Sequence, residues 1–404
     1  MRPTAARQLA LSVVSASALL LLACPDKTVR VGAVVPMTGV DQVYGESIKR
    51  GIEIAYAEIQ AQGDLKVPVE LLGIEDSTSE PELALEKLQE LYDAGAFAVI
   101  GGVTTDEVQK MLEVADRYDR VLLSPSASSP ELTSVSSNFY RIWPSDFTSA
   151  NKMADFAILD CETVVVVVER TYGKGIQGVF QTAFEEDGGE VQEVIEIPSH
   201  TSDFSGIAER VMTLNPDAVY LAAYEVGVGG MVQELRRMSF EGKILTTSAF
   251  ATTSAIARIG QDAVGVFLTQ TFFDSESEFA HVQRFVKPFR ERFGVDPDIY
   301  AAHGYDAFKV LVAAVEGVPP KLPGDMQDGM RDVQEFEGVT GSIQFNEKGD
   351  VQKYPRVYVI GEDLTLYDYN ERVKEQKDEL RRKREELQRR LEQIRREASS
   401  VEGG

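Results

Sequence analysis

Cysteine is scarce in this sequence: its 404 residues include only Cys24 and Cys161. A disulfide between two cysteines that both follow Cys24 is therefore excluded, and so is a metal site built from several cysteines. The three histidines, at 200, 281 and 303, are isolated and lack the spacing of metal ligands. The hydrolase motif GxSxG and the phosphate-binding motif GxxxxGK[ST] are missing too. We therefore expect no metal centre, no cofactor and no enzymatic activity.

Basic residues are also in short supply. The chain has 41 Lys and Arg against 65 Asp and Glu, a net charge of −24 at pH 7. Residues 371–404 alone hold 11 basic and 9 acidic residues, so the acidic excess lies in the middle of the chain. Such a surface repels nucleic acid and anionic membrane surfaces. We expect no nucleic-acid partner.

Only the N-terminus carries a long apolar run. Two arginines precede an uncharged stretch at 9–22, which is too short to span a membrane, and no second span follows. The letters LLAC at 21–24 resemble a bacterial lipobox, in which the Cys24 thiol receives the lipid. The sequence thus predicts an exported cell-envelope lipoprotein with a signal peptide at 1–24, held on the periplasmic side of a membrane by its lipid anchor. A plain signal peptide with an incidental Cys24 is the alternative.

From residue 29 onwards, short β-branched runs alternate with amphipathic segments of helical length. The first set has expected strands at 29–35, 67–74, 97–100 and 121–123, with helices at 46–60, 81–93 and 106–118. The second set has expected strands at 164–168, 191–197, 218–223 and 243–247, with helices near 176–186, 205–214 and 231–238. Two more helices, at 279–293 and 300–316, precede closing strands at 342–345 and 357–360. Apolar strands that alternate with helices indicate parallel sheets covered on both faces, hence an α/β fold of two doubly wound lobes.

Beyond residue 369 the composition changes abruptly. Apolar residues recur every seven positions, at 373, 380, 387, 394 and 401, among Glu, Lys and Arg. We expect a long charged helix over 370–404 that could self-associate as a coiled coil through 373–401. Because Lys377 and Arg384 occupy the seam, a solvated single helix is the alternative.

Three strand ends carry residues that suit a ligand. After the third strand, two glycines and a Thr104–Glu107 capping box start a helix, whose free N–H groups and positive dipole end favour a carboxylate. After the fourth strand, a Ser-Pro pair caps a helical turn and leaves residues 126–128 to face the crevice beyond the strands. Tyr172 follows the valine-rich strand of the second set. Taken singly, each segment is explained equally well by ordinary capping and turn chemistry.

Together these segments resemble the branched-chain amino-acid-binding periplasmic proteins of ABC importers. The resemblance covers about 29–369 and rests on an ordered set of short motifs: GAVVPMTG at 32–39 with YG at 44–45, SP…PEL at 124–132, YGxG at 172–175, DFS at 203–205, AVY at 218–220, YDA at 305–307 and GSIxFNxxGD at 341–350.

The resemblance implies the type 1 periplasmic-binding-protein fold, whose two lobes close on a ligand like a hinge. Three crossover segments would join the lobes, near 141–147, 268–273 and 340–347. Lobe 1 would comprise 25–144 and 271–341, and lobe 2 would comprise 145–270 and 342–369.

The resemblance also implies a ligand site. Thr105 falls where the family's carboxylate-binding serine sits, in line with the helix-terminus argument. In the loop that includes Ala127, Ser126 would offer its backbone carbonyl to the ligand. Ser128 occupies the position of a family threonine that contacts both ends of a bound amino acid. The aromatic wall around the ligand's side chain would be formed by Tyr44, Tyr172, Tyr224 and Tyr300. The implied partners are a small-molecule carboxylate and an ABC permease.

Two departures from the family matter. Its usual disulfide is missing, since Ser79 and Thr104 stand where the cysteines would be. The acid that pairs with a ligand's ammonium should lie in 246–251, around Ser248, but this segment has no Asp or Glu. Because a buried ammonium without a counter-charge is unfavourable, either Glu225 takes over or the ligand lacks an α-ammonium. We expect an amino acid or a related organic acid.

Two other function classes compete with this interpretation. The letters GKGIQG at 173–178 match the dinucleotide motif GxGxxG, but four residues separate them from the preceding valine strand, which that motif should follow immediately. The stronger rival is a regulatory or sensor lipoprotein of the same fold that acts on a partner protein through its coiled-coil tail. The tail favours this rival, because an importer's binding subunit needs no coiled coil.

Overall fold

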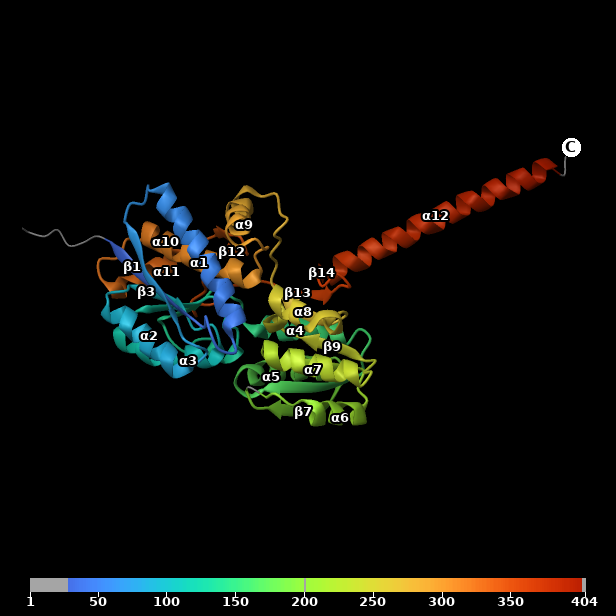
Figure 1. Ribbon diagram of the computed structural model, residues 1–404, viewed down its shortest axis with the longest axis horizontal. Coiled ribbons are helices and arrows are strands. Elements are labelled where there is room, and N and C mark those ends of the chain that lie inside the picture. The colour runs from blue at the N-terminus through green and yellow to red at the C-terminus, as the bar shows by residue number, and fades with distance from the viewer. Residues whose placement is uncertain (1–27, 200, 402–404) are drawn as a thin grey trace, which may run out of the picture.

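The computed structural model describes residues 28–199 and 201–401, with Arg170 and 391–401 described by their backbone alone. These residues form two α/β lobes and a long C-terminal helix (Figure 1). The predicted signal peptide and Cys24 lie outside the described residues.

The first lobe is built on a sheet of five parallel strands in the order β2-β1-β3-β4-β5. Successive side chains of β1 point to opposite faces: Val31 and Val35 belong to the core with α1 and α10, whereas Val34 belongs to the core with α2 and α3. The elements are β1 (Val29–Val35), α1 (Gln42–Gln62), β2 (Val69–Asp76), α2 (Pro81–Asp93), β3 (Ala98–Gly101), α3 (Thr105–Tyr118), β4 (Val121–Ser124), β5 (Phe139–Arg141), α9 (Ala280–Phe293), α10 (Ile299–Gly317), α11 (Met326–Asp332) and the two-stranded ribbon β11 (Phe336–Gly338) and β12 (Gly341–Ile343).

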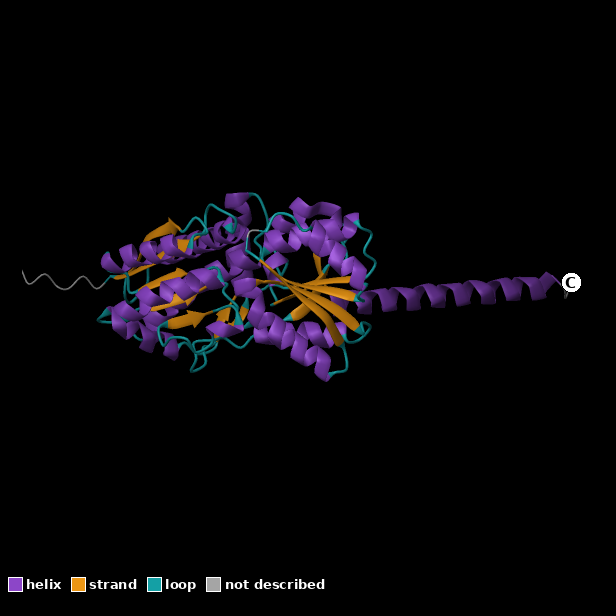
Figure 2. Cartoon of the chain, turned by 90° about the horizontal axis from the view of Figure 1, so that it is seen from below, coloured by secondary structure: helices purple, strands orange, loops and turns teal. Residues whose placement is uncertain are grey.

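The second lobe repeats this strand order as β7-β6-β8-β9-β10 and adds the antiparallel strands β13 and β14 beyond β10. Helices cover both sides of its sheet (Figure 2): α4 and α5 pack on one face, and α6 to α8 on the other. The elements are α4 (Asp146–Ala157), β6 (Thr163–Glu169), α5 (Arg170–Glu186), β7 (Glu190–Ile197), α6 (Ser205–Leu214), β8 (Ala218–Ala222), α7 (Glu225–Arg237), β9 (Lys243–Thr246), α8 (Thr253–Ile259), β10 (Phe267–Gln270), β13 (Arg356–Ile360) and β14 (Leu366–Asp368).

The chain passes between the lobes three times, at 142–145, 271–279 and 344–355. The predicted fold, two doubly wound lobes joined by three crossovers and followed by a long helix, is therefore confirmed. In such sheets ligands bind beyond the carboxyl ends of the parallel strands. Both sets of strand ends here face the space between the lobes, where side chains of one lobe reach the backbone of the other.

Helix α5 begins earlier than predicted. The sequence pattern placed Tyr172 in a loop ahead of a helix near 176, but α5 starts at Arg170 and includes Tyr172 in its first turn. Gly173 permits this start, because a Cβ at this position would lie 2.2 Å from the carbonyl oxygen of Ala222 on β8. The glycine therefore serves close packing of helix on strand.

Helix α12 (Tyr369–Val401) follows β14 directly and projects from the second lobe (Figures 1 and 2). Its first residue packs against the lobe: the ring centroid of Tyr369 lies 5.1 Å from Phe156 and 5.6 Å from Phe267. Asp368 Oδ1 accepts hydrogen bonds from the backbone N–H groups of Asn370 and Glu371, the second and third residues of the helix. Within the described chain, no helix combines the length and the apolarity needed to cross a membrane.

Candidate functional site

The N-terminus of α3 lies at the carboxyl end of β3 and carries the predicted capping box. Thr104 Oγ1 accepts a hydrogen bond from Glu107 N at 3.3 Å, and Glu107 Oε2 accepts one from Thr104 N at 3.4 Å and another from Val103 N at 2.9 Å. The Thr105 N–H instead donates across the crevice to the hydroxyl of Tyr224, at 3.0 Å. The buried Thr105 Oγ1 has no hydrogen-bond partner among the described residues. This helix terminus therefore presents polar groups to the space between the lobes.

The loop after β4 is held in place by its own serines. Ser124 Oγ donates to Gly102 O at 2.7 Å and accepts from Ala127 N at 2.9 Å. Ser126 Oγ donates to Val103 O at 2.8 Å, which ties this loop to the start of α3. The predicted cap at Ser129 is present, although it starts a single 3-10 turn, Pro130–Leu132.

Four tyrosines from both lobes form a continuous aromatic wall. Tyr44 on α1 and Tyr300 on α10 have ring centroids 4.8 Å apart, and Tyr172 on α5 stacks on Tyr224 at 4.4 Å. Tyr44 also lies 6.3 Å from Tyr224, which joins the two pairs. Tyr300 in turn stacks on Trp143 at 4.8 Å. The predicted aromatic residues thus lie together between the lobes.

Tyrosine hydroxyls also connect the lobes directly. Tyr44 Oη donates to Ala249 O at 2.7 Å, and Tyr300 Oη donates to Ser248 O at 3.0 Å. Together with the contact between Tyr224 and Thr105, three tyrosines reach from one lobe to the backbone of the other. The cavity left among them has a volume of about 10 Å³, room for about one water molecule. Its lining includes eight of the predicted residues: Tyr44, Ser126, Ala127, Ser128, Tyr172, Tyr224, Ser248 and Tyr300.

Glu225 lies beside this cavity but is not part of its lining. It is the first residue of α7, and its backbone N–H donates to Tyr44 Oη at 3.0 Å. Its buried carboxylate forms an ion pair with Arg258 of α8. The negative charge of Glu225 is therefore already matched by a cation of the chain.

Asp146, which sequence reasoning missed, lies against the cavity. Ser128 Oγ donates to its Oδ2, and Tyr172 Oη lies 3.2 Å from the same oxygen. The side chain is fully buried, and Oδ1 has no hydrogen-bond partner among the described residues. Burial raises the pKa of Asp146 to about 6, although hydrogen bonds from Ser128 and Tyr172 oppose the shift. The sequence signal was Pro144-Ser145-Asp146, because a serine cap after proline starts a helix with the aspartate at its first position.

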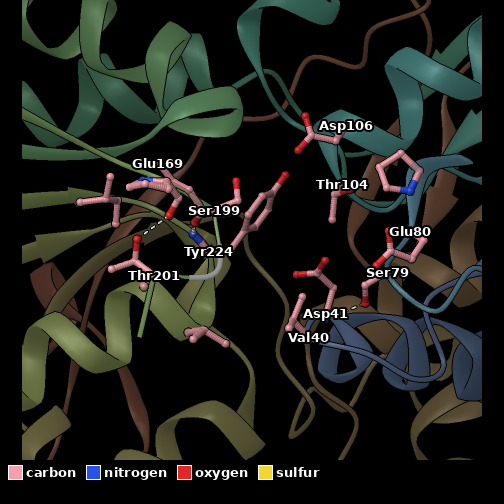
Figure 3. Close-up of a pocket in the computed structure, with 15 residues that line it drawn as sticks. Val40, Asp41, Ser79, Glu80, Thr104, Asp106, Glu169, Ser199, Thr201 and Tyr224 are labelled. Atoms are coloured by element: carbon pink, nitrogen blue, oxygen red, sulfur yellow. Dashed lines mark hydrogen bonds between the residues drawn. The ribbon is translucent and has the colours of Figure 1, made fainter. Parts of the chain in front are cut away.

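A second cavity, of about 90 Å³, lies at the mouth of the crevice and shares Tyr224 with the first (Figure 3). Asp41, Asp106 and Glu169 line it from both lobes. Burial, followed by repulsion from Glu107 and Glu169, raises the pKa of Asp41 to about 7. Acidic side chains of both lobes thus gather at the entrance to the crevice.

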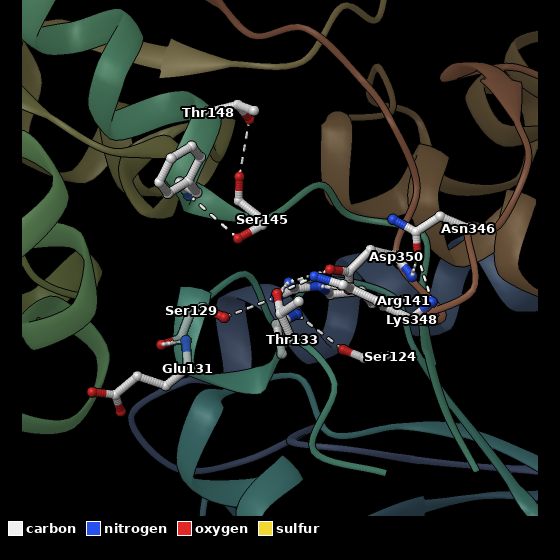
Figure 4. A network of polar contacts seen from close by, with 12 residues as sticks. Ser124, Ser129, Glu131, Thr133, Arg141, Ser145, Thr148, Asn346, Lys348 and Asp350 are labelled. Atoms are coloured by element: carbon white, nitrogen blue, oxygen red, sulfur yellow. Dashed lines mark hydrogen bonds and ion pairs between the residues drawn. The ribbon is translucent and has the colours of Figure 1, made fainter. Parts of the chain in front are cut away.

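A buried ion pair lies where the chain crosses between the lobes, behind the loop that follows β4 (Figure 4). Arg141 Nε lies 2.6 Å from Asp350 Oδ1, and Arg141 Nη2 lies 3.1 Å from Asp350 Oδ2. Arg141 Nη1 donates to Ser129 O at 2.8 Å, and Nη2 donates to Thr133 Oγ1 at 2.6 Å. This guanidinium thus joins the end of β5 to the third crossover and to the end of the loop that follows β4.

The described part of the chain offers few candidate residues for metal binding or for nucleophilic catalysis. It contains no cluster of three or more His, Cys, Asp and Glu side chains arranged to hold a metal ion. Cys161 is buried, and burial raises the pKa of its thiol to about 11. What the geometry provides is a narrow space between two lobes, with hydrogen-bonding groups at its ends and an aromatic wall.

Comparisons with known proteins agree with this geometry. Residues 28–360 match the family described as periplasmic binding protein. The Leu/Ile/Val-binding protein BraC3 of Rhizobium johnstonii is 24% identical over 85% of this chain and 94% of its own length. The Leu/Ile/Val-binding protein homolog 3 of Brucella melitensis is 22% identical over 80% of this chain and 88% of its own length.

Solved structures show the same similarity. A leucine-binding protein of Thermotoga maritima superposes with a TM-score of 0.78 at 26% identity, over 84% of this chain and 97% of that one. A solute-binding protein of an ABC transporter from R. palustris, in complex with benzoate, has a TM-score of 0.76 at 21% identity, over 85% and 95% of the two chains. The match over residues 28–360, together with the two lobes and the crevice between them, shows that this chain belongs to the periplasmic binding protein family.

Proposed function

We propose that this chain is an exported solute-binding protein, lipid-anchored through Cys24, that captures a small carboxylate-bearing ligand for an ABC importer. The ligand, an amino acid or a related organic acid, is held between the two hinged lobes. The observation that carries this proposal is the convergence of eight residues from both lobes on one cavity, where doubly wound folds bind their ligands. The names of the relatives, which bind leucine, isoleucine, valine or benzoate, support the ligand class.

The carboxylate of the ligand takes the place of the Tyr224 hydroxyl at the Thr105 N–H. A carboxylate is the stronger acceptor, and the dipole of α3 favours a negative charge at this point. The unpartnered Thr105 hydroxyl offers a second donor. A hinge movement that separates the lobes breaks the 3.0 Å contact with Tyr224 and frees the site for the ligand.

An ammonium group on the ligand has its counter-charge in Asp146. This carboxylate supports the proposal because it touches Ser128 and Tyr172, which line the cavity, and because its Oδ1 has no partner among the described residues. With a pKa of about 6, Asp146 is mostly ionised at pH 7. It therefore substitutes for the acid that the segment around Ser248 lacks.

Calorimetry with three related ligands tests the carboxylate and the ammonium of the ligand separately. The three ligands are leucine, leucinamide and the deaminated 4-methylpentanoate. We expect the amide to bind at least about tenfold more weakly than leucine, because losing a charge-assisted hydrogen bond costs about 1.5–3 kcal/mol. Removing the amino group should cost less affinity than removing the carboxylate. Phenylalanine and 3-phenylpropionate repeat the comparison with an aromatic body. Amides that bind as tightly as acids would remove the carboxylate site from the proposal.

A proline substitution isolates the backbone donor. Thr105 is the first residue of α3, a position that accepts proline, and Thr104 before it has the extended backbone that proline requires. Thr105→Pro therefore removes the N–H and leaves the helix start in place, whereas Thr105→Ala keeps the N–H. We expect the proline variant to lose about tenfold or more in affinity for carboxylates, and the alanine variant to lose less. Similar affinities in both variants would show that the N–H is not the ligand's donor.

The projecting helix α12 favours a second candidate, a regulatory or sensor lipoprotein that acts on a partner protein. An importer's binding subunit does not require such a helix. A chain that ends at Tyr369 separates the two functions. An importer subunit keeps both ligand binding and ligand uptake by cells, whereas a regulator keeps ligand binding and loses the response of its partner.

A further inference from the structure

Helix α12 presents a narrow apolar stripe to solvent. After Tyr369 the helix extends away from the second lobe (Figures 1 and 2). Leu380 and Leu387 are 65% and 60% exposed, although large apolar side chains are normally covered. Together with Val373 they recur every seven residues, so all three lie on one side of the helix.

Cations border this stripe on both sides. With Val373, Leu380 and Leu387 at heptad position d, position a is occupied by Lys377 and Arg384. Four of the six neighbouring e and g positions hold exposed cations, Lys374, Arg381, Lys383 and Arg390, and the other two hold Gln376 and Gln388. The acids of the same stretch lie at b, c and f, away from the stripe: Glu375, Asp378, Glu379, Glu385 and Glu386. We call the stripe and its six bordering cations the basic seam.

The basic seam opposes pairing between two copies of this helix. In an antiparallel pair e meets e and g meets g, which brings cations together. In a parallel pair each g meets the following e of the partner, and of the resulting pairs (Gln376 with Arg381, Lys383 with Gln388, Arg390 with Arg395) only the last joins two cations. Lys377 and Arg384 would add like charges to the buried seam. Three of the six bordering cations, Arg381, Lys383 and Arg390, do pair with acids one turn back, Asp378, Glu379 and Glu386. Such exposed pairs contribute only about 0.3–0.5 kcal/mol each and can exchange partners.

A membrane surface fits the basic seam less well than a helix does. Helices that lie in a membrane interface bury a broad apolar face that carries Trp, Phe or Leu. Between 371 and 390 the helix has one apolar residue in every seven and no aromatic residue. That width suits the seam of a coiled coil, in which one or two positions per heptad are covered by a partner.

We propose that the basic seam binds an acidic amphipathic helix of another protein. That helix carries leucine or isoleucine opposite Leu380 and Leu387. Glutamate or aspartate stands at its positions facing Lys377, Arg384 and the flanking cations. Opposite charges at these positions fix both the partner and its orientation. The inference is independent of the ligand crevice, so either could fail without the other.

Hydrogen exchange on the full chain tests the proposal. The probe is a synthetic four-heptad peptide with leucine at d and glutamate at a, e and g, and the same peptide with lysine at these positions is its control. We expect the acidic peptide to slow the exchange of the amides over 373–390 by about tenfold or more, and the basic peptide to leave them unchanged. The effect should weaken as salt is raised.

Two double variants test which face of helix α12 contacts the acidic peptide. Lys377→Glu with Arg384→Glu should weaken peptide binding by about tenfold or more, whereas Arg382→Glu with Arg389→Glu, the same charge change on the far face, should preserve it. No protection by the acidic peptide would overturn the proposal. So would concentration-dependent association of the chain alone through 373–390. Protection by phosphatidylglycerol vesicles without any protection by the peptide would identify a membrane as the occupant instead.

Discussion

Burial raises the pKa of Asp146 to about 6, so at neutral pH the folded protein holds an ionised carboxylate away from water. Because this pKa lies above the ordinary value of 3.8, the stability associated with the group is present at acid pH and is lost as the pH rises through 6. A ligand ammonium, in contrast, needs the ionised form. Asp146 thus lowers the stability of the folded protein at the pH values at which its ionised form could bind a cation.

Asp146→Asn should therefore stabilise the protein at pH 8 and abolish any preference for amino acids over their deaminated analogues. A shift of about two pKa units corresponds to a gain on the order of 2–3 kcal/mol at pH 8, and the gain should shrink toward pH 4. Thermal unfolding at both pH values measures it. Asp155→Asn, an exposed position on the same helix, is the control. If the stability of both variants changed with pH in the same way, the raised pKa could not be assigned to Asp146.

In the proposed complex, the Tyr224 hydroxyl competes with the ligand for the Thr105 N–H. Tyr224→Phe removes the hydroxyl and keeps the stacking on Tyr172, so carboxylates should bind roughly 3- to 10-fold more tightly, the equivalent of one ordinary hydrogen bond. Tyr44→Phe removes another hydroxyl between the lobes without touching this donor and should not tighten binding. Weaker binding by Tyr224→Phe would mean that the hydroxyl contacts the ligand itself.

Short sequence motifs made part of this site predictable, whereas the contacts between residues distant in sequence could not be predicted. The capping box of Thr104 and Glu107 spans four residues, so its donors and acceptors can be identified in the sequence alone. The role of Asp146 depends on Ser128 and Tyr172, which reach it from a distant loop and from another helix. The pairing of Glu225 with Arg258 depends in the same way on α7 packing against α8. No local pattern encodes such contacts.

Among the elements, the strongly periodic ones were predictable and the short ones were not. Buried runs such as β6 and helices such as α2 carry unmistakable patterns, and α2 was predicted with its observed bounds. β5 and β14 have three residues each, too few for any alternation to show. They exist because neighbouring strands offer them hydrogen bonds. Tertiary pairing, rather than propensity, defines them.

The hinge pair between β5 and the third crossover should be sensitive to loss of one partner. Asp350→Asn leaves the buried guanidinium of Arg141 without its counter-charge, which typically costs about 3–5 kcal/mol. Urea unfolding measures the loss. Glu70→Gln, which breaks the exposed pair with Arg30, should cost less than about 1 kcal/mol. Equal losses in the two variants would show that the hinge pair is no more important than a surface contact.

For the molecule as a whole, the proposed lipid anchor would determine where the crevice operates. If Cys24 accepts the lipid, Cys24→Ser should release processed protein from membranes or leave uncleaved precursor. Membrane fractionation with an antibody to the chain distinguishes these outcomes from wild type, and Cys161→Ser serves as the control for loss of a thiol. A processed Cys24→Ser protein that stays in the membrane fraction would exclude this residue as the anchor.

Helix α12 continues β14 without a linker, and Tyr369 packs on the second lobe, so lobe and helix turn together. Its 33 residues extend about 50 Å at 1.5 Å per residue. A rotation of the lobe by about 15°, the angle through which the dimers of haemoglobin turn, would carry the far end of the helix through roughly 13 Å. If the lobes open in this way, the helix would act as a lever arm that converts a small opening of the crevice into a much larger displacement at its far end.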